Sequence, residues 1–279
     1  KNQLNLDTLA IVPKVTFKKK AMPGDKTLLF TNPDIGSEFP EAFRVLRNIF
    51  ISSLNKKEKI VMATSSVPGE GKTTLILQLA ALLSRGDKLP CDDTEREPIS
   101  IIYQTAEDGL GDTIKPRLLS GNADCTRIKV IDESEVPLTM LDTRVEQAIQ
   151  ETGARMIILD PMQAYLGEKV DMNRANEVRS ILSQLGRIAE KYKCAIILVG
   201  HLNKMQGTKA NYRGLGSVDF QATARSVLVV GRVKDSPETR VMAHQKSSLA
   251  PEGEPIAFEL NKETGFHWIG HYDISIDDL

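Results

Sequence analysis

Nine consecutive residues combine two glycines with a lysine and neighbouring hydroxyl groups: Ser66, Val67, Pro68, Gly69, Glu70, Gly71, Lys72, Thr73 and Thr74. Glycines let successive backbone N–H groups approach phosphate oxygens at the start of a helix. In the pattern G-x-x-x-x-G-K-[ST], the lysine reaches the β- and γ-phosphates and the next hydroxyl ligates magnesium. Ser66 stands at the first position, where the pattern has glycine. The run therefore predicts a site for ATP and Mg²⁺; the alternative is a chance glycine turn before a helix.

A carboxylate must lie near such a magnesium ion, and Asp160 is placed for this role. The apolar run at 156–159 predicts a buried strand that ends at Asp160. Ligands bind at the carboxyl edge of a parallel sheet. We expect Asp160 to bind the metal together with Thr73. The alternative is an acid that merely ends a strand.

Hydrolysis also needs a group that orients or deprotonates the attacking water. Glu107 follows the apolar strand expected at 99–104 and is our candidate base. Asp108 is adjacent and could serve instead. A plain loop carboxylate is the third interpretation.

A polar residue also follows the strand expected at 195–200, which ends in His201. This position favours a sensor of nucleotide state beside the γ-phosphate. The alternative is a structural hydrogen-bonding histidine.

The stretch at 203–217 carries three cations and one aromatic ring: Lys204, Lys209, Tyr212 and Arg213. Cations with a stacking ring suit single-stranded nucleic acid. A solvated active-site loop explains the same residues equally well.

These side chains must be positioned by strands and helices that alternate along the chain. Apolar runs at 59–64, 99–103, 156–159 and 195–199 predict parallel strands buried on both faces, and residues 175–188 repeat apolar side chains at helical spacing. Later strands, expected at 226–230, 240–243, 256–260 and 266–268, predict antiparallel additions at one edge of the sheet. We therefore expect an α/β fold with a largely parallel sheet flanked by helices.

The expected organisation is a flexible arm at 1–37, an N-terminal helix at 38–57, an ATPase domain at 58–270 and an acidic tail at 271–279. The 279 residues suit one large domain with an appendage. A net charge of -1 confines any nucleic-acid surface to a local patch. Three separated cysteines indicate neither a zinc site nor a disulfide framework. We expect a cytoplasmic location, close to a membrane if a membrane segment precedes Lys1.

From about residue 69 to 270 the chain resembles RecA-like P-loop ATPases of the replicative hexameric helicase kind, the RepA type of the AAA families. Five ordered motifs carry the resemblance, at 69–74, 103–108, 158–161, 200–204 and 214–217. It implies a homo-oligomeric ring that acts on single-stranded DNA, with Glu107 as catalytic glutamate and His201 as sensor. It also implies a cation on the late strands that acts across a subunit interface, with Lys246 as first choice and Arg232 and Arg240 behind it.

Residues 7–74 resemble a second family, the bacterial tyrosine autokinases of capsule and exopolysaccharide export. The matching motifs are the run at 9–13, Glu41-x-x-Arg44-x-x-Arg47 and the run at 64–73. This resemblance implies assembly through the helix at 38–57 and a membrane-bound polysaccharide co-polymerase as partner. The D-x-D-x-R motif of that family is replaced by Thr105-Ala-Glu-Asp, and its tyrosine cluster is absent.

Three functions therefore compete. We expect an oligomeric ATPase coupled to nucleic acid, with Lys72, Glu107, Asp160, His201 and Lys246 as its catalytic residues. A tyrosine autokinase or its regulatory relative is the second hypothesis, and a nucleotide-gated scaffold is the third.

Overall fold

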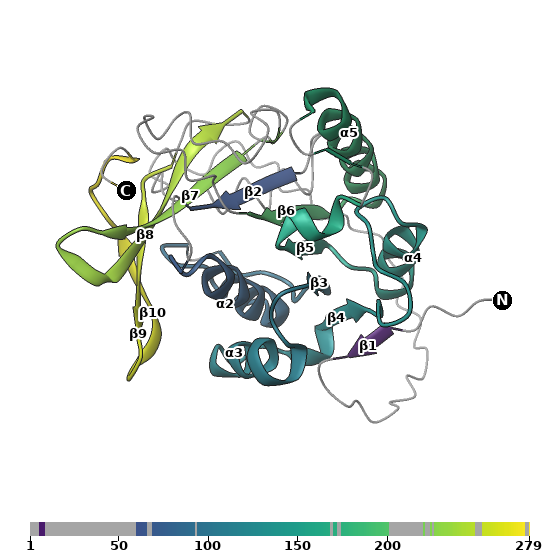
Figure 1. The fold of residues 1–279 in the computed structure, drawn as a ribbon. Helices are drawn as coiled ribbons and strands as arrows, with labels where there is room; N and C mark the ends of the chain where they lie inside the picture. Colours follow the sequence, from purple (N-terminus) through teal and green to yellow (C-terminus); the bar gives the residue numbers. More distant parts are fainter. Residues whose placement is uncertain are drawn as a thin grey trace, which may run out of the picture.

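A ten-stranded sheet runs through the part of the chain that the structure describes (Figure 1), with strand order β1-β4-β3-β5-β6-β2-β7-β8-β9-β10. The structure is a computed structural model. It describes residues 6–8, 60–65, 69–92, 94–167, 170–171, 174–200, 220, 224, 226–248, 253–276 and 279. The helix expected at 38–57, with Glu41, Arg44 and Arg47, lies outside these residues.

The strands are β1 (Leu6–Thr8), β2 (Ile60–Thr64), β3 (Ile101–Thr105), β4 (Ile128–Ile131), β5 (Met156–Asp160), β6 (Ala195–Val199), β7 (Ser226–Val233), β8 (Ser236–Ser247), β9 (Ile256–Asn261) and β10 (Gly265–His271). The α-helices are α2 (Lys72–Arg85), α3 (Lys115–Ser120), α4 (Thr143–Thr152) and α5 (Ala175–Tyr192). The described residues also form a π-helix η1 (Leu110–Ile114) and the 3₁₀-helices η2 (Cys125–Arg127) and η3 (Met162–Tyr165).

The centre of the sheet is parallel, from β4 through β3, β5, β6 and β2 to β7. Strands β8, β9 and β10 add to it in antiparallel fashion, and β1 pairs antiparallel with β4 at the other edge. The predicted fold class is therefore confirmed. One detail differs, because β7 is parallel to β2 and the antiparallel addition begins only at β8.

Both faces of the sheet are covered by helices, which explains why the central strands are apolar throughout. Side chains alternate between the faces of a strand. In β2, Val61 and Ala63 pack with α2, whereas Ile60 and Met62 pack with α4 and α5. Figure 1 shows the resulting layers, with α2 and α3 on one face and α4 and α5 on the other. None of the described helices is long and apolar enough to cross a membrane.

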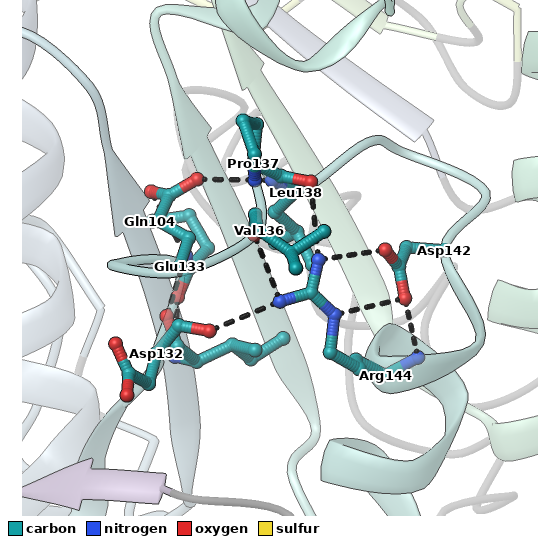
Figure 2. Close-up of polar contacts among 9 residues, drawn as sticks. Gln104, Asp132, Glu133, Val136, Pro137, Leu138, Asp142 and Arg144 are labelled. Carbon is teal, nitrogen blue, oxygen red and sulfur yellow. Dashed lines mark hydrogen bonds and ion pairs between the residues drawn. The ribbon is translucent and has the colours of Figure 1, made fainter.

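Arg144 ties the connection between β4 and α4 into a fixed loop (Figure 2). Its guanidinium donates to the carbonyl oxygens of Asp132, Val136 and Pro137 at 3.0–3.1 Å. Asp142 caps α4 by accepting from the backbone N–H of Arg144, and it also binds the guanidinium. These bonds satisfy backbone carbonyls that no strand or helix pairs.

A buried histidine, His244, links β8 to β7 and to Gly253, which precedes β9. Nδ1 of His244 accepts from the backbone N–H of Gly253 at 3.1 Å, so Nε2 carries the proton toward Ser226 Oγ, also at 3.1 Å. Burial lowers the pKa of His244 from 6.5 to about 4. The imidazole is therefore neutral in the folded protein at neutral pH.

Because the folded-state pKa of His244 is depressed, its contribution to stability is present above pH 6.5 and is lost as the pH falls toward 4. Acidification from pH 7.5 to pH 5 should cost about 2 kcal/mol of unfolding free energy through this residue. We expect His244→Gln to remove that part of the pH dependence in denaturant titrations. His267→Gln, at an exposed histidine of β10, should retain the wild-type profile. Identical pH profiles for His244→Gln and the wild type would contradict this account.

Candidate active site

Four parallel strands end at the same edge of the sheet, and the predicted site residues gather there. Strand β5 pairs with β3 so that Thr105 lies opposite Asp160. On its other side β5 pairs with β6, and β6 pairs with β2, which leads into the glycine run. The topology thus brings segments around residues 70, 107 and 160 to one place.

The glycine run adopts a backbone that other residues rarely take. Gly69 and Gly71 have φ angles of 82° and 87°, in the left-handed region. Helix α2 begins at Lys72, directly after Gly71, and its start has neither a side-chain cap nor an acidic residue in the first turn. The helix N-terminus therefore offers N–H groups and a positive dipole end to an anion. Ser66, Val67 and Pro68 lie outside the described residues.

Lys72 lies beneath this run, with only 4% of its surface exposed. Its ammonium donates to Ser65 Oγ at 2.6 Å. Burial lowers the pKa of Lys72 to about 8, while the charges of Asp160, Glu70 and Glu107 act in the opposite direction. Lys72 is thus a desolvated cation held in the field of three carboxylates.

Asp160 is held by two hydroxyl groups on the α2 side of the sheet. Tyr103 donates from its hydroxyl to Asp160 Oδ2 at 3.1 Å, and Thr73 of α2 also bonds to the carboxylate. Burial raises the pKa of Asp160, and the bonds from Thr73 and Tyr103 and the charge of Lys72 oppose this shift. The two predicted metal ligands, Thr73 and Asp160, are therefore in direct contact.

A magnesium ion that arrives with phosphates needs few protein ligands, because phosphate oxygens and water supply the rest. A hydroxyl beside a buried carboxylate fits this requirement. In the described part of the chain no three His, Cys, Asp or Glu side chains gather into a metal cluster. Thr73 and Asp160 suit an ion bound with a nucleotide, not one bound by protein ligands alone.

The structure places Glu107 and Asp108 differently. Asp108 Oδ2 forms an ion pair with Arg117 Nη1 at 3.1 Å. Glu107 is exposed at the same edge, and its charge acts on buried Lys72. The Asp108 carboxylate already binds an arginine of its own chain, so this arrangement favours Glu107 as the candidate base.

A second polar network lies on the other face of the same edge. Glu133 accepts from the hydroxyl of Tyr165 at 3.2 Å and from the backbone N–H of Leu138 at 3.2 Å. The buried amide of Gln104 bonds to both backbone groups of Ile131, which extends the pairing of β3 with β4, and contacts Glu133 (Figure 2). This network fixes the β3 end from which Glu107 follows.

Several predicted residues are not gathered at the site. Lys246 is paired with Val227 near the start of β7, toward the opposite end of the sheet, and its ammonium donates to the Ala224 carbonyl at 2.8 Å. The residues His201, Lys204, Lys209, Tyr212 and Arg213 lie outside the described part of the chain. Thr74 is half-buried within α2.

Ser65 and Tyr103 fall within the runs at 64–73 and 103–108 that carry the two resemblances, but neither was predicted to have a role in the site. Ser65 directly follows β2, and only its place before the glycine run could have suggested its contact with Lys72. Tyr103 alternates with Ile102 and Gln104 along β3, so strand periodicity could have placed it on the face of Asp160.

Comparisons with known proteins show the family to which the chain belongs. The model of the family described as AAA domain matches residues 56–207, more than half of the 279-residue chain. The DNA repair protein RadA of Helicobacter pylori (strain J99) is 26% identical over 199 residues, which cover 70% of this chain and 39% of that protein. The chain thus spans well under half the length of this curated relative.

Solved structures show the same fold at low sequence identity. The ATPase domain of G40P matches with a TM-score of 0.59 and 15% identity, over 84% of this chain and 91% of that chain. A DnaB-like replicative helicase matches with a TM-score of 0.56 and 13% identity, over 77% of this chain and 58% of that chain. The predicted RecA-like P-loop architecture is confirmed.

The bond from Tyr103 to Asp160 can be tested through the pH dependence of turnover. A hydrogen bond to the charged form of a carboxylate lowers its pKa, so Tyr103→Phe should raise the pKa of Asp160. We expect the acid limb of the kcat/KM profile to move to higher pH. Tyr165→Phe is the matched control, because its hydroxyl binds Glu133 instead. An unmoved limb in Tyr103→Phe would show that Asp160 does not depend on this bond.

Proposed function

This chain belongs to the AAA domain family and is a P-loop ATPase, and we propose that it hydrolyses ATP with Mg²⁺ as a homo-oligomer whose turnover is coupled to single-stranded DNA. One observation carries the proposal: Lys72, Thr73, Asp160 and Glu107 converge at the carboxyl edge of the parallel sheet, next to an uncapped helix N-terminus.

Each of these residues has a role that its position favours. The N–H groups that follow Gly69 and Gly71 surround the phosphates, and Lys72 binds the β- and γ-phosphate oxygens. Thr73 and Asp160 hold Mg²⁺, which when bound neutralises charge that develops on the phosphates. Glu107 accepts a proton from the attacking water and orients it.

Coupling to DNA rests on the relatives and on residues outside the described part of the chain. A named relative is a DNA repair protein, and a structural neighbour is a replicative helicase. In the sequence the stretch at 203–217 comes after β6, the strand that pairs with β5. Lys204, Lys209, Tyr212 and Arg213 are the proposed DNA contacts, and His201 is the proposed sensor.

Assembly and location belong to the same proposal. A ring would place a cation from one subunit near the nucleotide of the next, and Lys246 remains our first choice for that cation. Its distance from its own phosphate loop is compatible with a role across an interface. We place this ATPase in the cytoplasm. The autokinase resemblance rests on the runs at 9–13, 41–47 and 64–73, and no observation in the described chain favours it or its polysaccharide co-polymerase partner over the ATPase.

The experiment that tests the proposal measures phosphate release from ATP with and without single-stranded DNA, for wild type, Glu107→Gln and Asp108→Asn. We expect DNA to stimulate the wild type. Glu107→Gln should retain ATP affinity and lose turnover by on the order of 100-fold, because the amide keeps the shape and removes the base. Asp108→Asn should retain most turnover, since Asp108 is paired with Arg117.

If Asp108→Asn loses turnover and Glu107→Gln retains it, the base is Asp108 and not Glu107. Turnover that is indifferent to DNA would contradict the proposed coupling. Phosphotyrosine on the purified protein after incubation with ATP would favour the autokinase instead.

A further inference from the structure

A buried carboxylate lies within the phosphate-binding run itself. Glu70 stands between Gly69 and Gly71, and only 6% of its surface is exposed. A negative charge at this position repels the phosphates that the run is built to bind. Its Oε2 atom has no hydrogen-bond partner among the described residues, so its charge needs compensation from elsewhere.

Two arginines of the β7–β8 hairpin lie beside this carboxylate. Arg232 and Arg240 are directly opposite each other in the pairing of β7 with β8. Arg232 Nε lies 3.8 Å from Glu70 Oε2, and the Arg232 side chain is partly exposed. The hairpin thus brings cations to the outer side of the run from residues more than 150 positions later.

Arg240 is the more deeply placed of the two, with 7% of its surface exposed. Its Nη1 donates to the carbonyls of Glu238 at 2.9 Å and Leu260 at 3.1 Å, whereas its buried Nε has no hydrogen-bond partner in the described chain. Its Cδ lies 3.2 Å from the position that a Cβ on Gly71 would take. The Arg240 side chain therefore packs directly against the turn that opens α2.

The electrostatics of Arg240 agree with this geometry. Burial and the neighbouring charge of Arg232 lower its pKa, and the charge of Glu70 opposes them. Two like charges beside one another are unfavourable unless an anion lies between or near them. Glu70 and Glu238 are such anions, and of the two Glu70 belongs to the phosphate-binding run, where a bound triphosphate would add further negative charge.

We propose that Arg240, with Arg232, acts on the phosphate loop of its own subunit, as a positioning residue that neutralises Glu70 and holds the Gly69–Gly71 turn ready for the triphosphate. This inference rests on the proposed function, because it concerns the same nucleotide site. The β7–β8 hairpin, at the start of the antiparallel edge of the sheet, then contributes directly to nucleotide affinity. It also separates both arginines from the cation that is expected to act between subunits.

The test measures the Kd of a fluorescent ATP analogue with Mg²⁺ for four variants: Arg240→Met, Glu70→Gln, the double variant and Arg85→Met. Arg240→Met should raise the Kd about tenfold, because it leaves the Glu70 carboxylate uncompensated. Glu70→Gln alone should bind more tightly than the wild type, because it removes a negative charge that repels the phosphates. The double variant should recover to within about threefold of the wild type, which a purely structural role of Arg240 would not produce.

Arg85→Met is the matched control. Arg85 lies at the far end of the same helix α2 and also donates to a backbone carbonyl, that of Gly121 at 2.6 Å. Its loss should lower the melting temperature without changing the Kd. If the Kd rises as much in Arg85→Met as in Arg240→Met, the loss of affinity in Arg240→Met reflects general destabilisation, and the inference is overturned.

Arg232→Gln provides a second route if Arg240→Met does not fold, since Arg232 is partly exposed. It should weaken binding about threefold, and Glu70→Gln should again restore the affinity. Unchanged affinity in both arginine variants, or a failure of Glu70→Gln to restore it, would overturn the inference. A wild-type protein that binds no nucleotide would instead overturn the proposed function itself.

Discussion

Lys72 and Asp160 are both buried at the carboxyl edge of the sheet. Each stays charged only because neighbouring groups favour its charged form, and each is one of the groups that favour the other. Burial alone would favour a neutral lysine and a protonated carboxyl group. Asp160, Glu70 and Glu107 support the ammonium, while Thr73, Tyr103 and Lys72 support the carboxylate. The site is thus a balanced cluster whose charges are ready to be rearranged by a triphosphate and its metal.

The fold serves this cluster by bringing distant segments to one edge. Parallel strands must be joined by crossovers, so the residues that follow β2, β3 and β5 are far apart in sequence and adjacent in space. Helices on both faces exclude water from the strands below the site. The Arg144 loop and the Gln104–Glu133 network then fix the ends of β3 and β4, so that the exposed Glu107 follows a rigid strand.

Much of this arrangement could be predicted from local pattern. The sequence predicts the glycine run, the apolar strands β2, β5 and β6, and helix α5, because each depends on a pattern among residues that are close together in the sequence. Strand β3 lies two residues later than expected, at Ile101–Thr105. Strand β4 was not predicted, because it is short and Lys129 interrupts its apolar residues.

Contacts between residues that are far apart in the sequence could not be predicted from it. The residues around Arg240 in the sequence do not predict that its side chain packs on Gly71. The contact depends on the pairing of β7, β8 and β9 in order beside β2. The parallel pairing of β7 with β2 could likewise not be predicted, because the residue pattern of a strand does not encode its direction. The sequence prediction preferred Lys246 to Arg232 and Arg240, yet the register of β8 places Lys246 toward the opposite end of the sheet.

The most direct measurement is Mg²⁺-dependent phosphate release from ATP by the wild type and by Lys72→Ala. No other described cation lies within the glycine run, so the account predicts turnover in the wild type and a loss on the order of 100-fold or more in the variant. Near-normal turnover in Lys72→Ala, with circular dichroism unchanged, would contradict the assignment of this site.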